Sequence, residues 1–462
     1  MTAVEALAAT RGEALLAHAL PPHIHVATDS RTLRPGDAFL ALRGARFDGH
    51  RFTAEARNRG ATAVIVDDPS AVPSGMPAIV VRDTKGAYLA LATAARRACG
   101  ARVIAITGSA GKTTTKALLH QILRKAGAGA VAATSANENN EIGVSKLFLG
   151  LPPHTDIVVA EFGARHYGDI STLVSIALPD IAVLTNVGDA HLEIMGSRER
   201  LAETKWSIFS LGAAAILNAR DTVSLERAPT LAAPPRWFAA VGSAESVAPA
   251  NGRHTTVLRG RSELAVATDA GIERYPTHCA LPGEHNRANV AAACAAAIAA
   301  GTSANAVAEC LQDLVLPEGR YERTRIGDVE VIFDAYNASM AGMLATLDAF
   351  AAERAERRIA VLSSMAELGD GSASMHERVG AAAARSDLAA LLVGGEYAPD
   401  LERGARDAGI SPERVIRFRN NGEAVRWLED HARAGDVVLL KGSRMYHLEE
   451  VVEGLREIRH DD

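Results

Sequence analysis

Residues 101–127, ARVIAITGSAGKTTTKALLHQILRKAG, carry the local pattern that decides the fold. The run RVIAIT is a continuous apolar segment of the kind that forms a buried strand. A glycine-rich turn follows, and Leu118, Leu119, Ile122 and Leu123 then recur on one face of an expected helix, with Gly127 as its C-cap. The stretch therefore predicts a strand, a tight loop and a helix in immediate succession.

A loop of this kind is suited to holding phosphate groups. Gly108 and Gly111 let backbone N–H groups approach an anion closely, and the helix N-terminus adds partial positive charge. Lys112 would neutralise phosphates, and the Thr113 hydroxyl suits a Mg²⁺ ion. Ile106 stands where the longer GxxxxGK[ST] form has glycine, so a glycine-rich turn with an exposed lysine is the alternative. We favour a nucleotide site.

Similar apolar runs recur along the rest of the chain, separated by helical stretches. Continuous apolar strands that alternate with helices predict an α/β class with parallel sheets covered on both faces. The other runs are DIVVAEF (156–162), DIAVLTNV (180–187), AAAILN (213–218), RIAVLSS (358–364), LAALLVGG (388–395) and GDVVLLKG (435–442).

The length of the chain and two changes in composition along it indicate three domains. At roughly 150 residues per domain, 462 residues predict about three. An alanine-rich helical stretch gives way to the first strand near Gly100, and the polar stretch PEGRYERTR (317–325) follows a long helical region. We therefore expect an N-terminal α/β domain at 1–100, a central P-loop domain at 101–316 and a C-terminal Rossmann-like domain at 317–462.

Composition restricts the class of protein. The 49 basic and 55 acidic residues give a net charge of −6, which argues against non-specific binding of nucleic acid. The longest apolar stretch, 290–300, is far shorter than a bilayer span, and Glu5 and Glu13 stand where a secretory leader would be basic. We expect a cytoplasmic protein that does not insert into membranes.

The cysteines show no CxxC spacing and are expected to be buried thiols: Cys99, Cys279, Cys294 and Cys310.

Three further side chains are candidates for metal chemistry near the phosphate loop. Glu161 ends one apolar strand and His191 follows another, and ligands of open α/β sheets bind beyond the carboxyl ends of strands. Taken singly, Glu161 could cap the next helix and His191 could be a hydrogen-bonded turn residue. Lys205 follows in a helical stretch, where a lysine close to a metal requires its charge to be removed.

The ordered set of motifs resembles the Mur ligase family over nearly the whole chain. Folylpolyglutamate synthases share the central and C-terminal halves but would not explain the first segment. The segments that carry the resemblance, besides 106–116 and EFGA (161–164), are TDSRTLRPGDAFLALRGARFDGHRF (28–52), TSANENNEIGVS (134–145), NVGDAHLEIMGSRERLAETK (186–205), LPGEHNRANVAAA (281–293), GRYE (319–322), FDAYNAS (333–339), MAELGDGSASMHERVG (365–380) and LLKGSR (439–444).

The resemblance implies a role for each matched residue, with ATP and Mg²⁺ as cofactors and Lys205 carbamylated by CO₂. Catalytic roles fall on Lys112, His191, Lys205 and Arg320, and metal contacts on Thr113, Glu161, His191 and Lys205. ATP would contact Gly108, Gly111, Lys112, Thr113, Thr114, Asn286, Asn289, Arg320 and Asp334, with the asparagines at adenine, Arg320 at the γ-phosphate and Asp334 at the ribose. Substrates would contact Ser30, Arg31, the loop from Gly44 through Asp48 to His50, Asn137, Asn140, Tyr336, Asn337, Lys441, Ser443 and Arg444, with the first two and the loop at the uridine diphosphate. For the last three residues, a solvated basic turn is the alternative.

The implied activity is ATP-dependent amide-bond formation through an acyl phosphate. Within the family, the motifs resemble most closely the enzymes that add D-alanyl-D-alanine to a UDP-N-acetylmuramoyl-tripeptide in peptidoglycan synthesis. Departures fall on the acceptor side, at Ser339–Gly342, at Ser363 and Ser364, and at Ser145. A related ligase that joins another amine to another acid, and a non-catalytic nucleotide-binding protein, are the alternatives. We expect a monomer that acts on small molecules.

Overall fold

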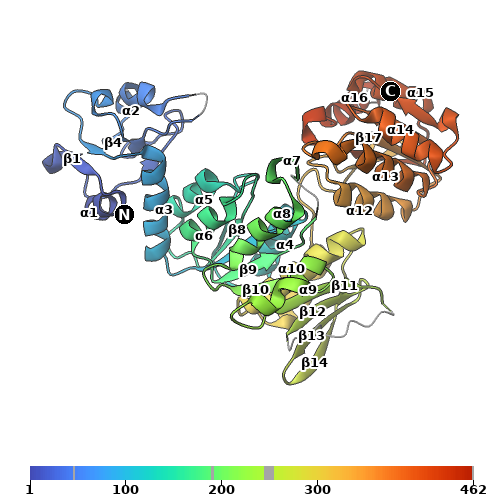
Figure 1. Ribbon diagram of the computed structural model, residues 1–462, viewed down its shortest axis with the longest axis horizontal. Helices are drawn as coiled ribbons and strands as arrows, with labels where there is room; N and C mark the ends of the chain where they lie inside the picture. The colour runs from blue at the N-terminus through green and yellow to red at the C-terminus, as the bar shows by residue number, and fades with distance from the viewer. Residues whose placement is uncertain (45–46, 189–191, 244–253, 460–462) are drawn as a thin grey trace. The chain divides into compact units, whose positions relative to one another are not determined.

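The computed structural model describes residues 1–44, 47–188, 192–243 and 254–459. Its strands form three sheets of five, nine and six strands, and helices accompany each sheet (Figure 1). The backbone divides into two compact units, one of residues 1–105, 129–163 and 168–180 and one of residues 106–128, 164–167 and 181–462. The predicted α/β class is therefore confirmed, and the domain boundaries stay a prediction.

The N-terminal sheet has the strand order β1-β5-β4-β3-β2. β2 to β5 pair in parallel, and β1 is antiparallel to β5. Because side chains alternate along a strand, Ala63 and Ile65 of β4 join the core beneath α3, whereas Val64 and Val66 join the core on the α2 side. The elements are α1 (Ala3–Thr10), β1 (Glu13–Leu15), β2 (Val26–Ala27), β3 (Ala38–Leu40), α2 (Thr53–Asn58), β4 (Ala63–Val66), β5 (Ala78–Val80) and α3 (Thr84–Ala98).

The nine-stranded sheet has the order β14-β13-β12-β11-β10-β9-β6-β8-β7. β6 has the bounds of the apolar run from which it was predicted, and the runs at 156–162, 180–187 and 213–218 form β8, β9 and β10. The strands are β6 (Arg102–Thr107), β7 (Val131–Ala133), β8 (Ile157–Glu161), β9 (Ile181–Leu184), β10 (Ala214–Asn218), β11 (Arg236–Val241), β12 (Thr255–Arg259), β13 (Glu263–Thr268) and β14 (Gly271–Pro276).

The far end of this sheet departs from the expected alternation of strands and helices. β12, β13 and β14 follow one another as an antiparallel meander, with no helix between them. β14 is almost entirely exposed. An antiparallel edge strand with one solvent-exposed face does not need a continuous apolar run. The pattern that predicts the parallel strands therefore does not predict β12, β13 and β14.

Helices of the central region pack on the nine-stranded sheet and on one another. α10 lies against α4, β11 and β12, and its many alanines allow this close approach. The helices are α4 (Lys112–Lys125), α5 (Glu141–Leu149), α6 (Asp169–Ala177), α7 (Leu192–Met195), α8 (Arg198–Trp206), α9 (Thr222–Arg227), α10 (Glu284–Ala299) and α11 (Ala304–Glu309).

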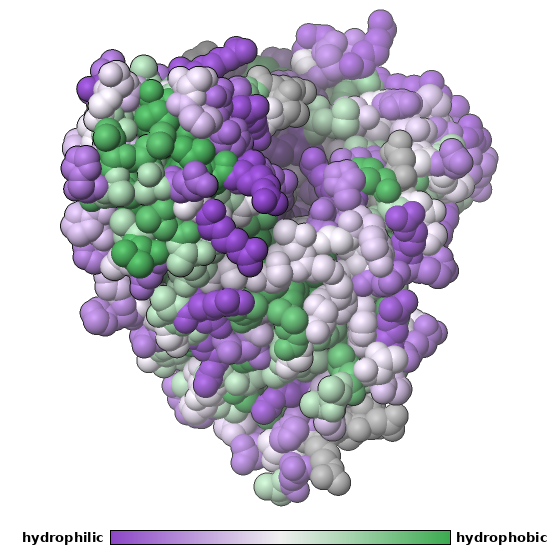
Figure 2. Space-filling view, turned by 60° about the vertical axis from the view of Figure 1, so that its left-hand side comes forward, coloured by the Kyte–Doolittle hydropathy of each residue, from purple (hydrophilic) through white to green (hydrophobic). Residues whose placement is uncertain are grey.

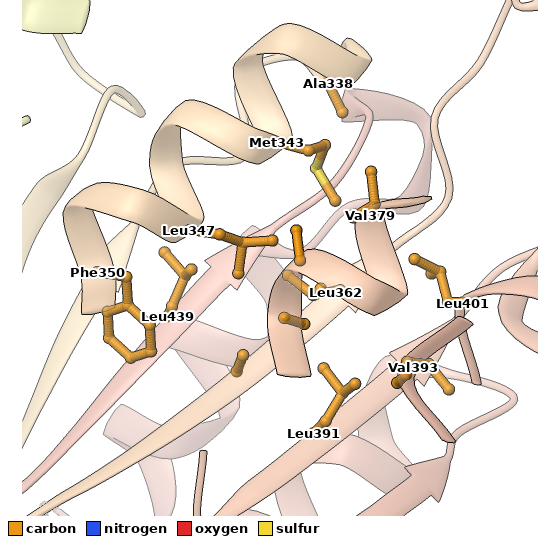
Figure 3. Close-up of a cluster of buried hydrophobic side chains, with 14 of the residues drawn as sticks. Ala338, Met343, Leu347, Phe350, Leu362, Val379, Leu391, Val393, Leu401 and Leu439 are labelled. Atoms are coloured by element: carbon orange, nitrogen blue, oxygen red, sulfur yellow. The ribbon is translucent and has the colours of Figure 1, made fainter. Parts of the chain in front are cut away.

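The C-terminal sheet has the order β15-β16-β20-β17-β18-β19, with only β15 antiparallel. One core packs against α12, α13 and α14 and the other against α15 and α16. Figure 3 shows side chains of α12, among them Met343, Leu347 and Phe350, in one cluster with strand residues that include Leu362 and Leu439. The elements are β15 (Glu322–Ile326), β16 (Val329–Phe333), α12 (Met340–Ala351), β17 (Arg357–Ser363), α13 (Ser372–Ala384), β18 (Ala390–Gly394), α14 (Ala398–Asp407), β19 (Val415–Arg417), α15 (Asn421–His431), β20 (Asp436–Lys441) and α16 (Glu449–Arg459).

The surface mixes polar and apolar residues. On the face in Figure 2, hydrophilic residues are widespread and hydrophobic ones form patches between them. Among the described helices, none combines the length and apolar character that crossing a bilayer requires.

Cys279, Cys294 and Cys310 are buried as expected, and Cys99 is half-buried.

Candidate active site

The phosphate loop has a backbone that only glycine accommodates. Gly108 and Gly111 have φ angles of +150° and +82°. A Cβ atom on Gly108 would lie 1.9 Å from Thr185 Oγ1, and one on Gly111 would lie 2.3 Å from Asn289 Oδ1. α4 begins at Lys112 directly after Gly111, so the helix N-terminus points its free N–H groups at the loop.

The neighbouring strand end holds this loop in place. Asn186 accepts hydrogen bonds from the main-chain N–H of Ser109 and, through Oδ1, from that of Ala110, at 2.9 and 3.1 Å. The Thr185 hydroxyl donates to the Ala110 carbonyl at 2.6 Å. Lys112 folds back so that Nζ donates to the Gly108 carbonyl at 2.8 Å. The loop is therefore preorganised with its lysine already above it.

A cavity of about 310 Å³ opens at the phosphate loop within the second unit. Residues from the phosphate loop and from the C-terminal region line it together. Of the predicted site residues, its described lining contains Gly111, Lys112, Thr113, Arg320, Asn337, Lys441, Ser443 and Arg444. Residues predicted from motifs more than 300 positions apart in the sequence thus face one space.

A second cavity, of about 250 Å³, is suited to the nucleoside part of a nucleotide. The predicted residues Thr114, Asn286, Asn289 and Asp334 line it, together with Arg320, which lines both cavities. Phe238 and His285 add the flat surfaces of their rings. The predicted adenine and ribose contacts thus lie around a single cavity beside the phosphate loop.

Asp334 and Lys441 form a buried ion pair between these cavities. Lys441 Nζ lies 3.1 Å from Asp334 Oδ2 and donates to the carbonyls of Asp334 and Asn337, both at 2.9 Å. Asp334 also accepts hydrogen bonds from the Tyr321 main chain and the Thr346 hydroxyl. Burial lowers the pKa of Lys441, and Asp334 opposes that shift. The solvated-turn alternative therefore fails for Lys441, which is 3% exposed.

Arg320 and Arg444 both lie over the ring of Tyr336. Their guanidinium carbons are 4.5 and 5.3 Å from the ring centroid. A ring face attracts cations, so Tyr336 stabilises two guanidinium groups that would otherwise repel each other. This concentrates positive charge where the first cavity opens.

His285 makes stability in this region depend on pH. Its Nδ1 atom is buried, and burial lowers the pKa of the imidazole from 6.5 to about 4. Between these values the unfolded chain binds a proton that the folded chain does not, so stability falls as pH falls through this window. The difference between the two pKa values corresponds to roughly 3 kcal/mol, and the loss is smaller than this because His285 lines the cavity.

We therefore expect His285→Gln to flatten the acid side of the stability profile. Urea unfolding of the wild type should give a lower free energy of unfolding at pH 5 than at pH 7, and the variant should show a smaller difference. His431→Gln, at an exposed histidine stacked on Trp427, is the matched control. Equal pH dependence in His285→Gln and wild type would show that His285 is not the titrating group.

The candidate metal ligands lie on separate elements. Glu161 ends β8 and is 1% exposed; its Oε1 accepts a hydrogen bond from Asn139 Nδ2 at 2.9 Å. It does not cap α6, which begins after Gly168. Lys205 lies in α8 and is also 1% exposed. Among the described residues no group of three or more His, Cys, Asp or Glu side chains forms a metal site, and His191 lies outside those residues.

The available donors nevertheless fit a magnesium ion. A threonine hydroxyl, a buried carboxylate and a carbamate are hard oxygen ligands, which Mg²⁺ prefers. Lysine is rarely buried as fully as Lys205, and conversion to a carbamate would replace its ammonium group with an anion able to contact a metal ion. Glu161 belongs to the first unit and Thr113 and Lys205 to the second, so their joint role stays a prediction.

The predicted uridine diphosphate residues lie in the N-terminal region. Ser30 is buried, whereas the exposed Arg31 forms a two-pronged ion pair with Asp29 and lowers the pKa of that carboxyl to about 2. Asp48 accepts from the His50 main chain and from its Nδ1. These contacts fix the described part of the loop, and residues 45 and 46 lie outside it. The assigned roles stay predictions.

The two predicted asparagines before α5 differ in their surroundings. Asn140 caps α5 by accepting from the Gly143 N–H, and it lines a cavity of about 380 Å³ in the first unit. Asn137 is exposed on the preceding turn. Their neighbour Asn139, which was not predicted, is the one that contacts Glu161.

Comparison with known proteins assigns the family. Models of the Mur ligase family catalytic domain, the Mur ligase middle domain and the Mur ligase glutamate ligase domain match residues 23–97, 106–297 and 319–444. The UDP-N-acetylmuramoyl-tripeptide–D-alanyl-D-alanine ligase of Escherichia coli K12 is 33% identical over 438 residues, which cover 94% of this chain and 93% of that one. This chain belongs to the Mur ligase family.

Solved Mur ligase structures share the three-domain α/β fold. MurF from Acinetobacter baumannii superposes with a TM-score of 0.84 at 29% identity, covering 99% of this chain and 98% of that one. The MurF ligase of Thermotoga maritima in complex with ADP gives 0.80 at 28% identity, covering 95% and 98%. The predicted three-domain architecture of this Mur ligase is thereby confirmed.

Several residues outside the predicted set also line the cavities or hold the phosphate loop of this Mur ligase. Thr185 and Asn186 follow β9 directly, and their position at a strand end beside the phosphate loop was a signal that could have found them. His285 stands within the quoted stretch GEHNRAN. Arg165 lines the first cavity four residues after Glu161, and no pattern in the sequence singles it out.

Proposed function

We propose that this Mur ligase adds D-alanyl-D-alanine to a UDP-N-acetylmuramoyl-tripeptide, with hydrolysis of ATP to ADP and phosphate, in peptidoglycan synthesis. The observation that carries the proposal is the first cavity, where the phosphate loop and the C-terminal cations face one space. The names of the relatives from Escherichia coli and Bacillus subtilis, 33% and 32% identical, support this substrate pair.

Phosphoryl transfer comes first in the proposed reaction. The substrate carboxylate attacks the γ-phosphorus of ATP in line, the bond to the β,γ-bridging oxygen breaks, and ADP leaves. Negative charge spreads over the transferred group, so Lys112, Arg320 and the α4 N-terminus stabilise the transition state. Mg²⁺ held by Thr113, Glu161, His191 and carbamylated Lys205 would supply further positive charge at the phosphates.

Amide formation follows at the acyl phosphate. The acceptor nitrogen attacks the carbonyl carbon, and the C–O bond to phosphate then breaks, so phosphate leaves with the electron pair. Residues from two regions of the chain line the cavity, an arrangement that would limit hydrolysis of the acyl phosphate by water. ATP and a nucleotide-linked sugar are multiply charged and do not cross membranes, so we place the reaction in the cytoplasm. All the residues named in this proposal belong to one chain, so we propose that the enzyme acts as a monomer.

A second candidate is a Mur ligase that joins a different amine to its acid. Ser339, Met340, Ala341 and Gly342 depart from the expected acceptor motif, and Ser339 and Gly342 line the first cavity. A changed cavity wall is the place where a change of acceptor specificity would be encoded.

Phosphate release from ATP separates these possibilities. The assay contains UDP-N-acetylmuramoyl-tripeptide and a panel of dipeptides and amino acids, one at a time. Turnover with D-alanyl-D-alanine alone supports the proposal, and turnover only with another amine supports the second candidate. Binding of ATP without turnover in any combination would contradict ligase activity and favour a nucleotide-binding protein.

A further inference from the structure

The first cavity has a one-sided charge distribution. Its described lining carries five cationic side chains, namely Lys112, Arg165, Arg320, Lys441 and Arg444. Glu367 supplies the single carboxylate among the described lining residues. This glutamate lies in the stretch MAELG, which follows β17. The stretch contributes to the family resemblance, but the sequence predicts no role for Glu367.

Such a cavity suits the phosphates and the acid but repels the acceptor. An α-amino group has a pKa of about 8, so at neutral pH it arrives mainly as an ammonium ion. The cations that line the cavity oppose its entry, and such repulsion is stronger inside a protein than in bulk water. A nearby carboxylate lowers this barrier and directs the nitrogen toward one wall.

Glu367 has a backbone conformation that residues other than glycine rarely adopt. Its φ angle is +61°, which costs about 1 kcal/mol relative to a right-handed residue. Hydrogen bonds on the preceding residues fix the turn: Met365 N–H donates to His376 Nε2 at 2.8 Å, and Ala366 N–H donates to Ser443 Oγ at 3.0 Å. Leu368 is buried on the other side. Glycine adopts this backbone without strain, so a glutamate at this position carries a local conformational cost.

We propose that Glu367 binds the ammonium group of the incoming amino component and accepts a proton from its nitrogen as the amide forms. The carboxylate first pairs with R–NH₃⁺. One ammonium proton then passes to a Glu367 oxygen, which frees the nitrogen lone pair to attack the carbonyl carbon; departing phosphate takes the second proton when the C–O bond breaks. This inference rests on the proposed ligase function.

Glu367→Gln tests the charge with little change of shape. We expect the KM for D-alanyl-D-alanine to rise at least tenfold and kcat to fall, with the KM values for ATP and for the UDP-linked acid unchanged. Hydroxylamine is uncharged at neutral pH, so hydroxamate formation should proceed equally in variant and wild type. Asp370→Asn, which removes an exposed carboxylate three residues away and outside the cavity lining, is the matched control.

Glu367→Gly separates this role from a structural one. Because glycine adopts positive φ freely, the variant should melt at the same temperature as the wild type or higher, yet show the same rise in acceptor KM. Unchanged acceptor KM in both variants, or equal loss with hydroxylamine and dipeptide, would overturn the inference. Wild-type enzyme that fails with every amine would instead contradict the ligase function itself.

Discussion

Lys112→Ala is expected to lower kcat for ATP-dependent amide formation by roughly 10³-fold, the loss typical of removing one preorganised donor from a site of developing charge. The Lys112 ammonium lies over the phosphate loop, where Nζ donates to the Gly108 carbonyl at 2.8 Å. None of the three lining cations from the C-terminal region takes its place, because Lys441 is held by Asp334 and both Arg320 and Arg444 lie over Tyr336. Phosphate release under saturating substrates measures the effect.

The control for this prediction lies on the same helix. Lys125 ends α4 and forms an exposed ion pair with Asp313 at 3.6 Å, so Lys125→Ala should leave kcat unchanged. Circular dichroism should show the same helix content in both variants and the wild type. A Lys112→Ala enzyme that keeps activity close to that of the control would remove the phosphate loop from the mechanism.

Lys205→Ala is expected to abolish ligation to a similar extent, roughly 10³-fold or more, and a short carboxylate such as formate should restore part of the activity. The proposed carbamate brings a negative charge to a buried position in α8, and alanine leaves that position empty. A carboxylate small enough to enter would replace the missing anion. Initial rates measured with increasing formate give the degree of rescue.

Labelled bicarbonate provides a readout of the carbamate apart from activity. Wild-type protein equilibrated with ¹³C-bicarbonate should show a carbamate carbon signal that Lys205→Ala lacks. Lys146→Ala removes an exposed lysine paired with Glu138 and should keep both the signal and the activity. Full activity in Lys205→Ala, or a wild-type spectrum without the signal, would exclude the carbamate.

The parallel strands and the phosphate loop were predictable because their signals are local. β6 and α4 follow from consecutive residues, and Gly127 has the positive φ of +70° expected just after a helix end. The meander β12–β14 was not predictable in the same way, because an exposed edge strand does not need apolar residues on both faces. Burial on both faces is therefore what made the other strands visible in the sequence.

The site was predictable as a list of motifs but not as a set of contacts. The resemblance implies a substrate contact for Lys441 and a ribose contact for Asp334, but no local pattern reveals that the two pair across 107 residues. The stacking of Arg320 and Arg444 on Tyr336 is equally long-range. Glu367 lacked a role because its importance depends on the charges around the cavity, which only the folded chain brings together.

The central claim is that ATP activates a carboxylate as an acyl phosphate. Transfer of oxygen tests it most directly, because the carboxylate oxygen that attacks phosphorus must leave with the phosphate. With the terminal carboxylate of the UDP-linked tripeptide labelled with ¹⁸O, mass spectrometry should find one labelled oxygen in the phosphate for each amide formed. Amide formation that releases unlabelled phosphate would contradict the acyl-phosphate mechanism.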